Sequence, residues 1–296
     1  MHLNRKLFIL AIVGLLVNAT VWGLSWIAFK GLQNQGLHAL WATAGISTAA
    51  LLVTHFYARG ALSEVLRTPN LVGVMLAAGV TNVCFNSAVA LGDVVRVTLL
   101  FYLMPVWSAL LATRLLGEPL TPRALLRMGL GLLGAGFVLW RPEIGVPLPT
   151  SLPDVLAIVG GFGFALNNIM LRRAHAASDA ARAQAMFLGG AAVCLVLGIG
   201  FASTGLIPAP PSFAASTPLY GTLALWALLF LIANYGVQYG AARLPANTTA
   251  LIMLVEIPIA ALSAIALGAA TLRWQDVVGG VLIVAAPWWV RDKVKS

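Results

Sequence analysis

The chain has 296 residues, of which 60% are hydrophobic and only 9% are charged. A soluble domain has about 45–50% apolar and about 25% charged residues, so the composition excludes an ordinary soluble enzyme or binding domain. The formal net charge of +9 lies mainly between apolar runs rather than in a basic stripe interleaved with aromatic residues, so we expect no nucleic-acid partner.

Apolar runs of about 20 residues, the length that spans a bilayer, follow one another with short breaks. They predict an all-α integral membrane protein with ten transmembrane helices. Residues 1–29 could also be a signal peptide, but no clear cleavage site follows, and we expect a retained first helix. The expected spans are residues 7–29, 37–58, 70–92, 95–115, 122–140, 153–172, 183–204, 217–242, 247–268 and 274–291.

The positive charges sort by side once the ten spans are drawn. With ten helices, both ends of the chain lie on one side of the membrane. Only four of the 18 Lys and Arg residues, Lys30, Arg96, Arg141 and Arg273, fall on the other side. The positive-inside rule therefore places both termini in the cytoplasm.

Helices four and nine share an unusual pattern. Residues from Thr98 to Glu118 form an apolar span with one proline, Pro105, and the span from Leu251 to Ala269 repeats this pattern around Pro258. A proline inside a span frees the carbonyl four residues earlier, which must find another partner in lipid. Paired, interrupted segments of this kind indicate the central site of a transporter, and we interpret both prolines as hinges.

The long breaks at residues 141–154 and 204–218 contain four prolines each. The first divides the chain into a five-helix repeat at residues 1–145 and a second repeat at residues 146–296. Because five is odd, the second repeat must cross the membrane in the opposite sense. An offset of 153 residues carries Pro105 to Pro258, and an offset of 142 carries Lys30 to Arg172. We expect the two inverted repeats to surround a central cavity.

The stretch from Trp22 to Lys30 reads WGLSWIAFK. It resembles the first-helix signature of the EamA type of the drug/metabolite transporter superfamily, roughly W-G-S-N-F-V-A-I-K, from which Leu24 departs. Residues 116–121, LGEPLT, are similar to the element that follows helix four in that family. The second half departs from the pattern, because Gly268-Ala269 stands where a second Gly-Glu would be expected. Among relatives, amino-acid exporters of the YddG kind are most similar in the layout of helices three, four and eight.

Polar residues far from the ends of the spans are costly in lipid and mark candidate sites. Asn82 and Asn86 map by the repeat onto Tyr235 and Tyr239, which favours convergence of the two faces on one cavity. The alternative is that these amides only join neighbouring helices. The candidate substrate-binding residues are Asn18, Trp22, Asn82, Asn86, Tyr102, Asn167, Tyr235, Gln238 and Tyr239.

Glu256 is the acid that lies near the middle of a span, since the other eight acids lie at helix ends or in loops. A carboxyl group at that depth favours its neutral, protonated form. It is a candidate for proton coupling or for binding a substrate ammonium group, and the alternative is a protonated side chain bonded to a neighbouring helix.

The pattern and the resemblance together imply a secondary transporter in the inner membrane of a bacterium that alternates access by rocking one five-helix unit against the other. The scarcity of Lys and Arg at mid-depth favours small neutral or zwitterionic substrates, most of all amino acids including aromatic ones. The resemblance implies that the protein exports them. A multidrug or lipophilic-compound exporter remains an alternative. An intramembrane enzyme or a non-transporting scaffold is a distant one. No catalytic residue, metal site or cofactor is expected, and we expect a monomer.

Overall fold

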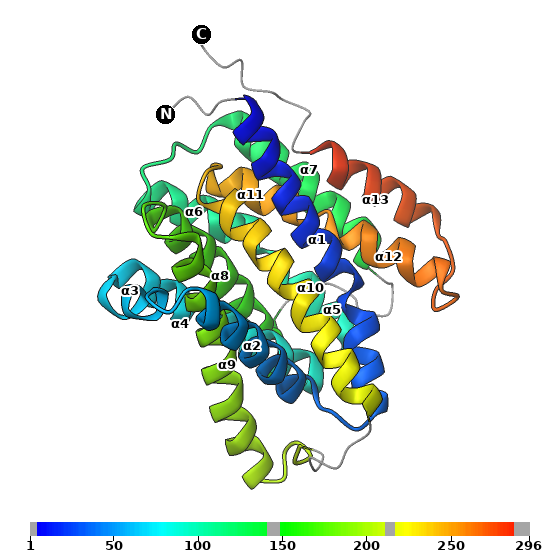
Figure 1. Cartoon of the computed structure of the whole chain (residues 1–296). Coiled ribbons are helices and arrows are strands. Elements are labelled where there is room, and N and C mark those ends of the chain that lie inside the picture. The colour runs from blue at the N-terminus through cyan, green and yellow to red at the C-terminus, as the bar shows by residue number, and fades with distance from the viewer. Residues whose placement is uncertain (1–4, 141–148, 211–216, 287–296) are drawn as a thin grey trace.

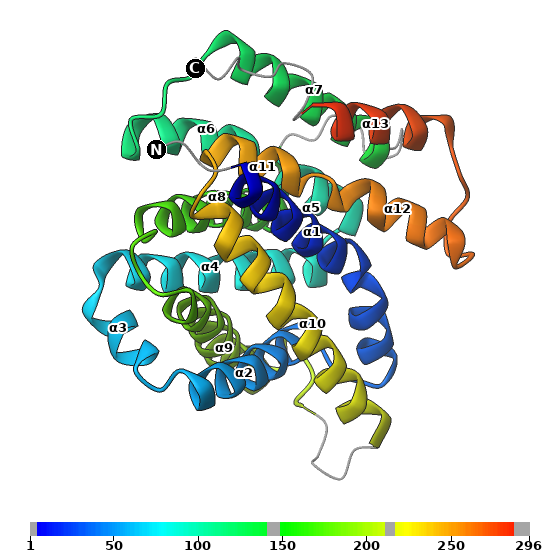
Figure 2. The same cartoon turned by 45° about the horizontal axis from the view of Figure 1, so that its top comes forward.

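The computed structural model describes residues 5–140, 149–210 and 217–286, and within these ranges the regular elements are all helices. Figures 1 and 2 show them as one bundle. The long breaks predicted at residues 141–154 and 204–218, and the end of the last predicted span, lie partly outside the described residues. The helices are α1 Arg5–Asn34, α2 Ala39–Tyr57, α3 Ala61–Arg67, α4 Pro69–Leu91, α5 Val94–Phe101, α6 Met104–Leu115, α7 Pro122–Leu139, α8 Leu152–Arg173, α9 Asp179–Ser203, α10 Thr217–Ala241, α11 Ala246–Met253, α12 Glu256–Ala266 and α13 Trp274–Ala285.

Nine segments of the described chain are long and apolar enough to cross a membrane, and α13 is a shorter apolar helix. α5 with α6 forms one such segment, and α11 with α12 forms another. The chain is therefore a multi-pass helical membrane protein. The predicted tenth span coincides with α13 as far as Ala285.

Both proline-containing spans are interrupted, as the sequence indicated. α5 ends at Phe101 and α6 begins at Met104, just before Pro105, while α11 ends at Met253 and α12 begins at Glu256. Proline fits the first turn of a helix, where its missing N–H group is not needed, so each second half-helix starts there. Each interrupted pair ends in a glycine of positive φ, Gly117 at 67° and Gly268 at 70°.

The freed carbonyls are accommodated differently at the two breaks. The Leu254 carbonyl accepts a hydrogen bond from the Ile257 N–H group at 3.0 Å, in a tight turn. At the other break, Gly161 of α8 packs on the Phe101 carbonyl so closely that an added Cβ atom would lie 2.5 Å from its oxygen. A glycine is therefore needed where α8 passes this break.

The two halves of the chain interleave in space. α8 packs against α4, α5 and α6, whereas α1 packs against α10, α11 and α12, and α2 crosses α9 (Figure 2). We call α4, α5, α6, α8 and α9 the α8 bundle, and α1, α10, α11 and α12 the α1 bundle. Each bundle contains helices from both sequence halves, so neither half forms a separate body.

Glycines allow the closest helix crossings. Added Cβ atoms would lie 2.7 Å from the Gly236 carbonyl oxygen at Gly14, and 2.7 Å from the Gly279 carbonyl oxygen at Gly134. The first contact joins α1 to α10, and the second joins α7 to α13. Small residues let backbones approach in lipid, where close packing holds helices together.

Candidate functional site

Tyr102 and Glu256 meet where the two interrupted helices face each other. Tyr102 follows the last residue of α5, Glu256 is the first residue of α12, and the Tyr102 hydroxyl donates a hydrogen bond to Glu256 Oε1. Tyr102 is buried and packs at the edge of the Phe101 ring, with 5.8 Å between the ring centroids. Helix α1 closes the other side, because Gly23 packs against the Glu256 carbonyl oxygen. The pair thus links the α8 bundle to the α1 bundle through one polar contact in apolar surroundings.

A second group of polar residues gathers around Met186 of α9. The side-chain amides of Asn234 and Gln238 on α10 point to the Met186 sulfur, at 3.5 and 2.7 Å, and Asn167 of α8 approaches it at 3.9 Å. Gln238 also donates to the Arg182 carbonyl at 3.0 Å. Asn167, Asn234 and Gln238 are all buried. Two predicted residues, Asn167 and Gln238, are therefore brought together here.

The other predicted residues lie on separate contacts. Asn18 donates to the Ala233 carbonyl at 2.8 Å, joining α1 to α10, and Asn86 donates to Thr43 of α2 at 2.9 Å. Asn82 donates to the Ala78 carbonyl of its own helix at 2.8 Å. The Asn18 and Asn86 bonds join neighbouring helices, as the alternative interpretation describes, whereas the Asn82 bond lies within α4.

The aromatic candidates also have distinct partners. The Tyr235 hydroxyl is hydrogen-bonded to the Tyr57 hydroxyl at the end of α2. Arg243 lies over the Tyr239 ring, 3.6 Å from its centroid, and Trp22 packs edge-on against Phe230 with centroids 4.8 Å apart. Asn82 and Asn86 thus have other hydrogen-bond partners than Tyr235 and Tyr239, and the convergence of the two faces on one cavity stays a prediction.

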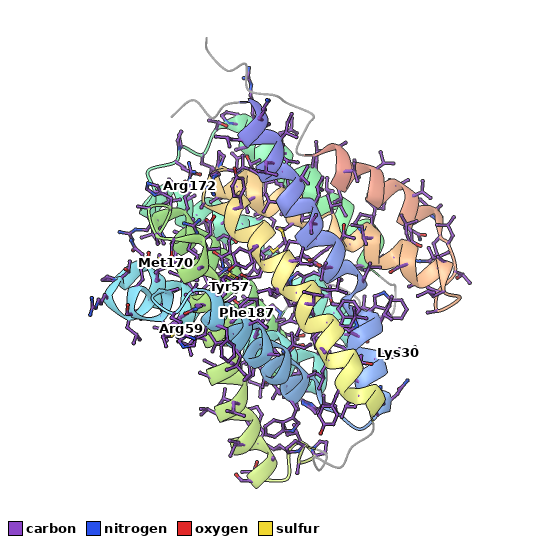
Figure 3. The ribbon with its side chains drawn as sticks, viewed as in Figure 1. Lys30, Tyr57, Arg59, Met170, Arg172 and Phe187 are labelled. Atoms are coloured by element: carbon purple, nitrogen blue, oxygen red, sulfur yellow. The ribbon has the colours of Figure 1, made fainter. Side chains whose placement is uncertain are left out.

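The end of the bundle at which α1 begins, which we call the N-terminal end, holds further polar contacts between the two bundles. Arg172 donates to the Ala242 carbonyl at 3.1 Å and lies 3.6 Å from Glu118, whose other oxygen accepts from the Ala246 N–H group at 3.2 Å. Figure 3 shows Arg172 near this end and Lys30, its counterpart in the repeat, near the opposite end.

At the opposite end, strong polar contacts lie within a bundle. Arg96 and Asp154 form a salt bridge at 2.8 Å that joins α5 to α8. Trp26 Nε1 donates to Ser263 at 3.0 Å, joining α1 to α12.

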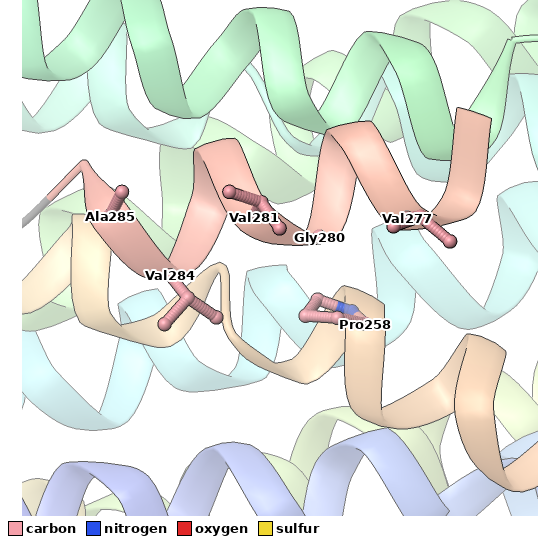
Figure 4. A pocket seen from close by; sticks show the side chains of 6 residues that line it. All are labelled: Pro258, Val277, Gly280, Val281, Val284 and Ala285. Atoms are coloured by element: carbon pink, nitrogen blue, oxygen red, sulfur yellow. The ribbon is translucent and has the colours of Figure 1, made fainter. Parts of the chain in front are cut away.

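Pro258 lies away from the polar residues. Its buried ring faces an apolar groove of about 470 Å³ between α12 and α13, which Figure 4 shows from close by. The groove is lined by Pro258, Val277, Gly280, Val281, Val284 and Ala285. Pro105 is buried at the start of α6. Both prolines shape the helix breaks, but the lining of this groove gives no hydrogen-bonding groups for a polar substrate.

Sequence reasoning missed three residues of these contacts. The sequence does not single out Met186, because a methionine in an apolar helix cannot be told from a residue that only packs against its neighbours. It does not single out Tyr57 either, because that residue lies at a helix end. The predicted spans 153–172 and 183–204 leave Arg182 in the connection between them, yet it lies in α9, is 1% exposed and donates to the carbonyls of Ala174, His175 and Ala177. The spacing of four between Arg182 and Met186, which puts both on one helix face, was the available signal.

Comparison with known proteins agrees with the sequence resemblance. Residues 9–140 match the model of the EamA-like transporter family. Residues 9–140 are therefore similar to EamA-like transporters. No curated protein matches the chain. A crystal structure described only as that of a protein shares 20% sequence identity, with a TM-score of 0.75, and the match covers 95% of this chain and 96% of the other. At that identity the similarity establishes a shared fold and nothing further.

Proposed function

We propose that this protein is a secondary transporter that exports small neutral or zwitterionic metabolites, above all amino acids including aromatic ones, by alternating access. The single observation that carries the proposal is the contact between Tyr102 and Glu256, which joins two interrupted helices at the centre of the bundle. Interrupted helices in corresponding positions of two repeats are the usual frame of a transporter's central site.

Residues 1–145 and 146–296 act, on this proposal, as inverted repeats of five spans each, with both termini in the cytoplasm of a bacterial cell and the protein in its inner membrane. The packing supports the symmetry. α8 rests on α4 and on the interrupted pair of the first half, just as α1 rests on α10 and on the interrupted pair of the second half. The opposite placement of Lys30 and Arg172 in Figure 3 is in keeping with inverted topology.

The bodies that rock against each other are the α8 bundle and the α1 bundle rather than the two sequence halves. With this orientation, the N-terminal end is cytoplasmic. The contacts of Arg172 with Ala242 and of Glu118 with Ala246 would then close the cytoplasmic side. Substrate would reach Tyr102, Glu256 and the Met186 group when the bundles part at the other end, with Pro105 and Pro258 at the hinges.

The test is exchange in liposomes that contain the purified protein. We expect labelled amino acids to exchange. Tyr235→Ala and Asn82→Ala should lower the exchange rate at a temperature where both variants are still folded, as their melting temperatures show. Exchange of lipophilic cations or drugs in place of amino acids would favour the multidrug alternative. If no member of a broad panel of amino acids and lipophilic metabolites binds or moves, the transport assignment is wrong.

Glu256 is the candidate for proton coupling, because its carboxyl lies at the junction of the two bundles. Glu256→Gln keeps the shape and an acceptor oxygen but removes the titrating group. We expect the variant to exchange substrate at a rate independent of pH, whereas the wild type changes its rate across the same range. An unaltered pH profile in the variant would remove protons from the mechanism.

A further inference from the structure

Three amide groups converge on one methionine sulfur at the seam between the bundles. Asn167 Nδ2, Asn234 Nδ2 and Gln238 Nε2 lie 3.9, 3.5 and 2.7 Å from Met186 Sδ. They come from α8 and α10, and the sulfur comes from α9, so three helices contribute. A thioether sulfur is a weak acceptor. Gln238 Nε2 also reaches two oxygen acceptors, so Asn167 and Asn234 are the amides whose N–H donors are directed at the weak sulfur acceptor.

Two of the three amide oxygens are left without partners. Asn167 Oδ1 and Gln238 Oε1 are buried and accept no hydrogen bond, although Asn167 is 2% exposed and Gln238 is 0% exposed. Amides that served only to join helices would pair their donors with oxygen acceptors, because a buried unpaired polar atom costs about 1–3 kcal/mol. Gln238 meets this expectation, whereas the Asn167 and Asn234 donors are aimed at the sulfur, and the oxygens of Asn167 and Gln238 stay unused.

The orientation of the amides is fixed by their neighbours. Gln238 Nε2 lies 3.0 Å from the Arg182 carbonyl, and only the nitrogen of the amide can donate to it. Gln238 Nε2 also lies 3.2 Å from Asn234 Oδ1, so the Asn234 nitrogen must point towards Met186. For Gln238 and Asn234 the donors, and not the oxygens, therefore face the sulfur, which suits a negatively charged or electron-rich oxygen and disfavours a metal cation.

Arg182 adds positive charge one helical turn from Met186. Its side chain is 1% exposed, one terminal nitrogen donates to the carbonyls of Ala174, His175 and Ala177, and the other is paired with Asp179. Its Nε atom is buried and has no hydrogen-bond partner. The charge of this guanidinium is paired with Asp179, so what remains at this place is one buried N–H donor without an acceptor.

We propose that Asn167, Asn234 and Gln238 bind the carboxylate of the transported substrate, whose oxygens take the hydrogen bonds now directed at the Met186 sulfur. Met186 can move aside because its side chain is unbranched and flexible. This inference rests on the proposed transport function and narrows its substrate class to compounds with a carboxylate. Charge-assisted hydrogen bonds to a carboxylate are about twice as strong as neutral ones. The amide N–H groups therefore bond a carboxylate oxygen much more strongly than the Met186 sulfur.

The experiment compares phenylalanine with 2-phenylethylamine, which has the same ring and amine but no carboxylate, in liposomes containing wild-type or variant protein. We expect the wild type to transport phenylalanine faster than 2-phenylethylamine. Gln238→Leu and Asn167→Leu should each lower phenylalanine transport about 10-fold while changing phenylethylamine transport less than about 2-fold, because one charge-assisted bond is lost. Gln184→Leu is the matched control, since Gln184 is equally buried on α9 but donates to the Ala58 carbonyl. Gln184→Leu should therefore still transport phenylalanine faster than phenylethylamine.

Met186→Leu gives a second, independent readout. It removes the competing sulfur acceptor at nearly constant volume, so we expect phenylalanine to bind a few-fold more tightly. Unchanged or weaker binding to this variant, or a preference that survives in both Gln238→Leu and Asn167→Leu, would overturn the carboxylate site. A variant that fails to fold leaves the decision to the Met186→Leu measurement. Wild-type protein that moves phenylethylamine but not phenylalanine would overturn the site and leave transport standing. Wild-type protein that moves nothing in the wider panel overturns both.

Discussion

At the scale of single residues, Tyr102 and Glu256 show how one buried hydrogen bond can join two interrupted helices. The Tyr102 hydroxyl donates to a carboxyl on the other interrupted helix, in apolar surroundings where an unpaired polar group is costly. Sequence reasoning could identify both residues, because each is polar and lies near mid-span. Their contact could not be predicted, since it depends on how helices four and nine face each other.

Tyr102→Phe tests the stability of this contact. The ring remains, but Glu256 loses its donor, so we expect the free energy of unfolding to fall by roughly 1–2 kcal/mol. Glu256→Gln keeps an acceptor oxygen and should cost less. Thermal unfolding in detergent measures both variants. Equal melting temperatures for wild type and Tyr102→Phe would show that the contact contributes nothing to stability.

His38 lies outside the membrane spans and caps α2, because its Nδ1 atom accepts a hydrogen bond from the Leu40 N–H group at 3.2 Å. Burial lowers the pKa of His38 below its ordinary value of 6.5. The unfolded chain therefore binds a proton more readily than the folded one, and stability falls as the pH drops below about 6.5. His38→Asn supplies a cap that does not titrate, so its melting temperature should fall less than that of the wild type between pH 7 and pH 5. A parallel fall in both proteins would contradict this role.

At the scale of helices, composition and hydrophobic runs were enough to place the spans and the two proline breaks. The partners of each span were not predictable, because lipid-facing and protein-facing surfaces are both apolar and no amphipathic pattern distinguishes them. The interleaving of α4 with α8 and of α1 with α10 came only from the structure. The contacts of Met186 and Tyr57 were not predictable either, because their partners lie far away in sequence on other helices.

Gly189 provides a test of helix packing. An added Cβ atom at Gly189 would lie 1.9 Å from the Met75 carbonyl oxygen, so α9 and α4 would have to separate. We expect Gly189→Ala to destabilise the protein by about 1–3 kcal/mol, as overpacking does. Gly200→Ala on the same helix meets no atom within 4 Å and should be neutral or slightly stabilising. Similar melting temperatures for the two variants would show that α4 and α9 are not packed in this way.

At the scale of the whole molecule, the polar contacts between the α8 bundle and the α1 bundle gather at the centre and at the N-terminal end. At the other end, the Arg96–Asp154 and Trp26–Ser263 contacts each hold one bundle together. The two bundles also touch at that end, where Ala202 of α9 packs against an apolar cluster that includes Leu32 of α1 and Leu219 of α10. On the proposed function, alternating access would part this apolar contact while the polar end stays closed. On the proposed topology, this arrangement is closed towards the cytoplasm.

The most direct test locks that closed end. Glu118 and Ala246 lie on opposite bundles, where Glu118 accepts from the Ala246 N–H group at 3.2 Å. Glu118→Cys with Ala246→Cys, in a background with Cys84→Ala and Cys194→Ala, allows a covalent link by oxidation or a short thiol cross-linker. Each single-cysteine variant treated in the same way is the control. If the two bundles rock apart, linked protein in liposomes stops exchanging amino acids and reduction of the disulfide restores exchange. Exchange at the same rate with the link fully formed would contradict the account.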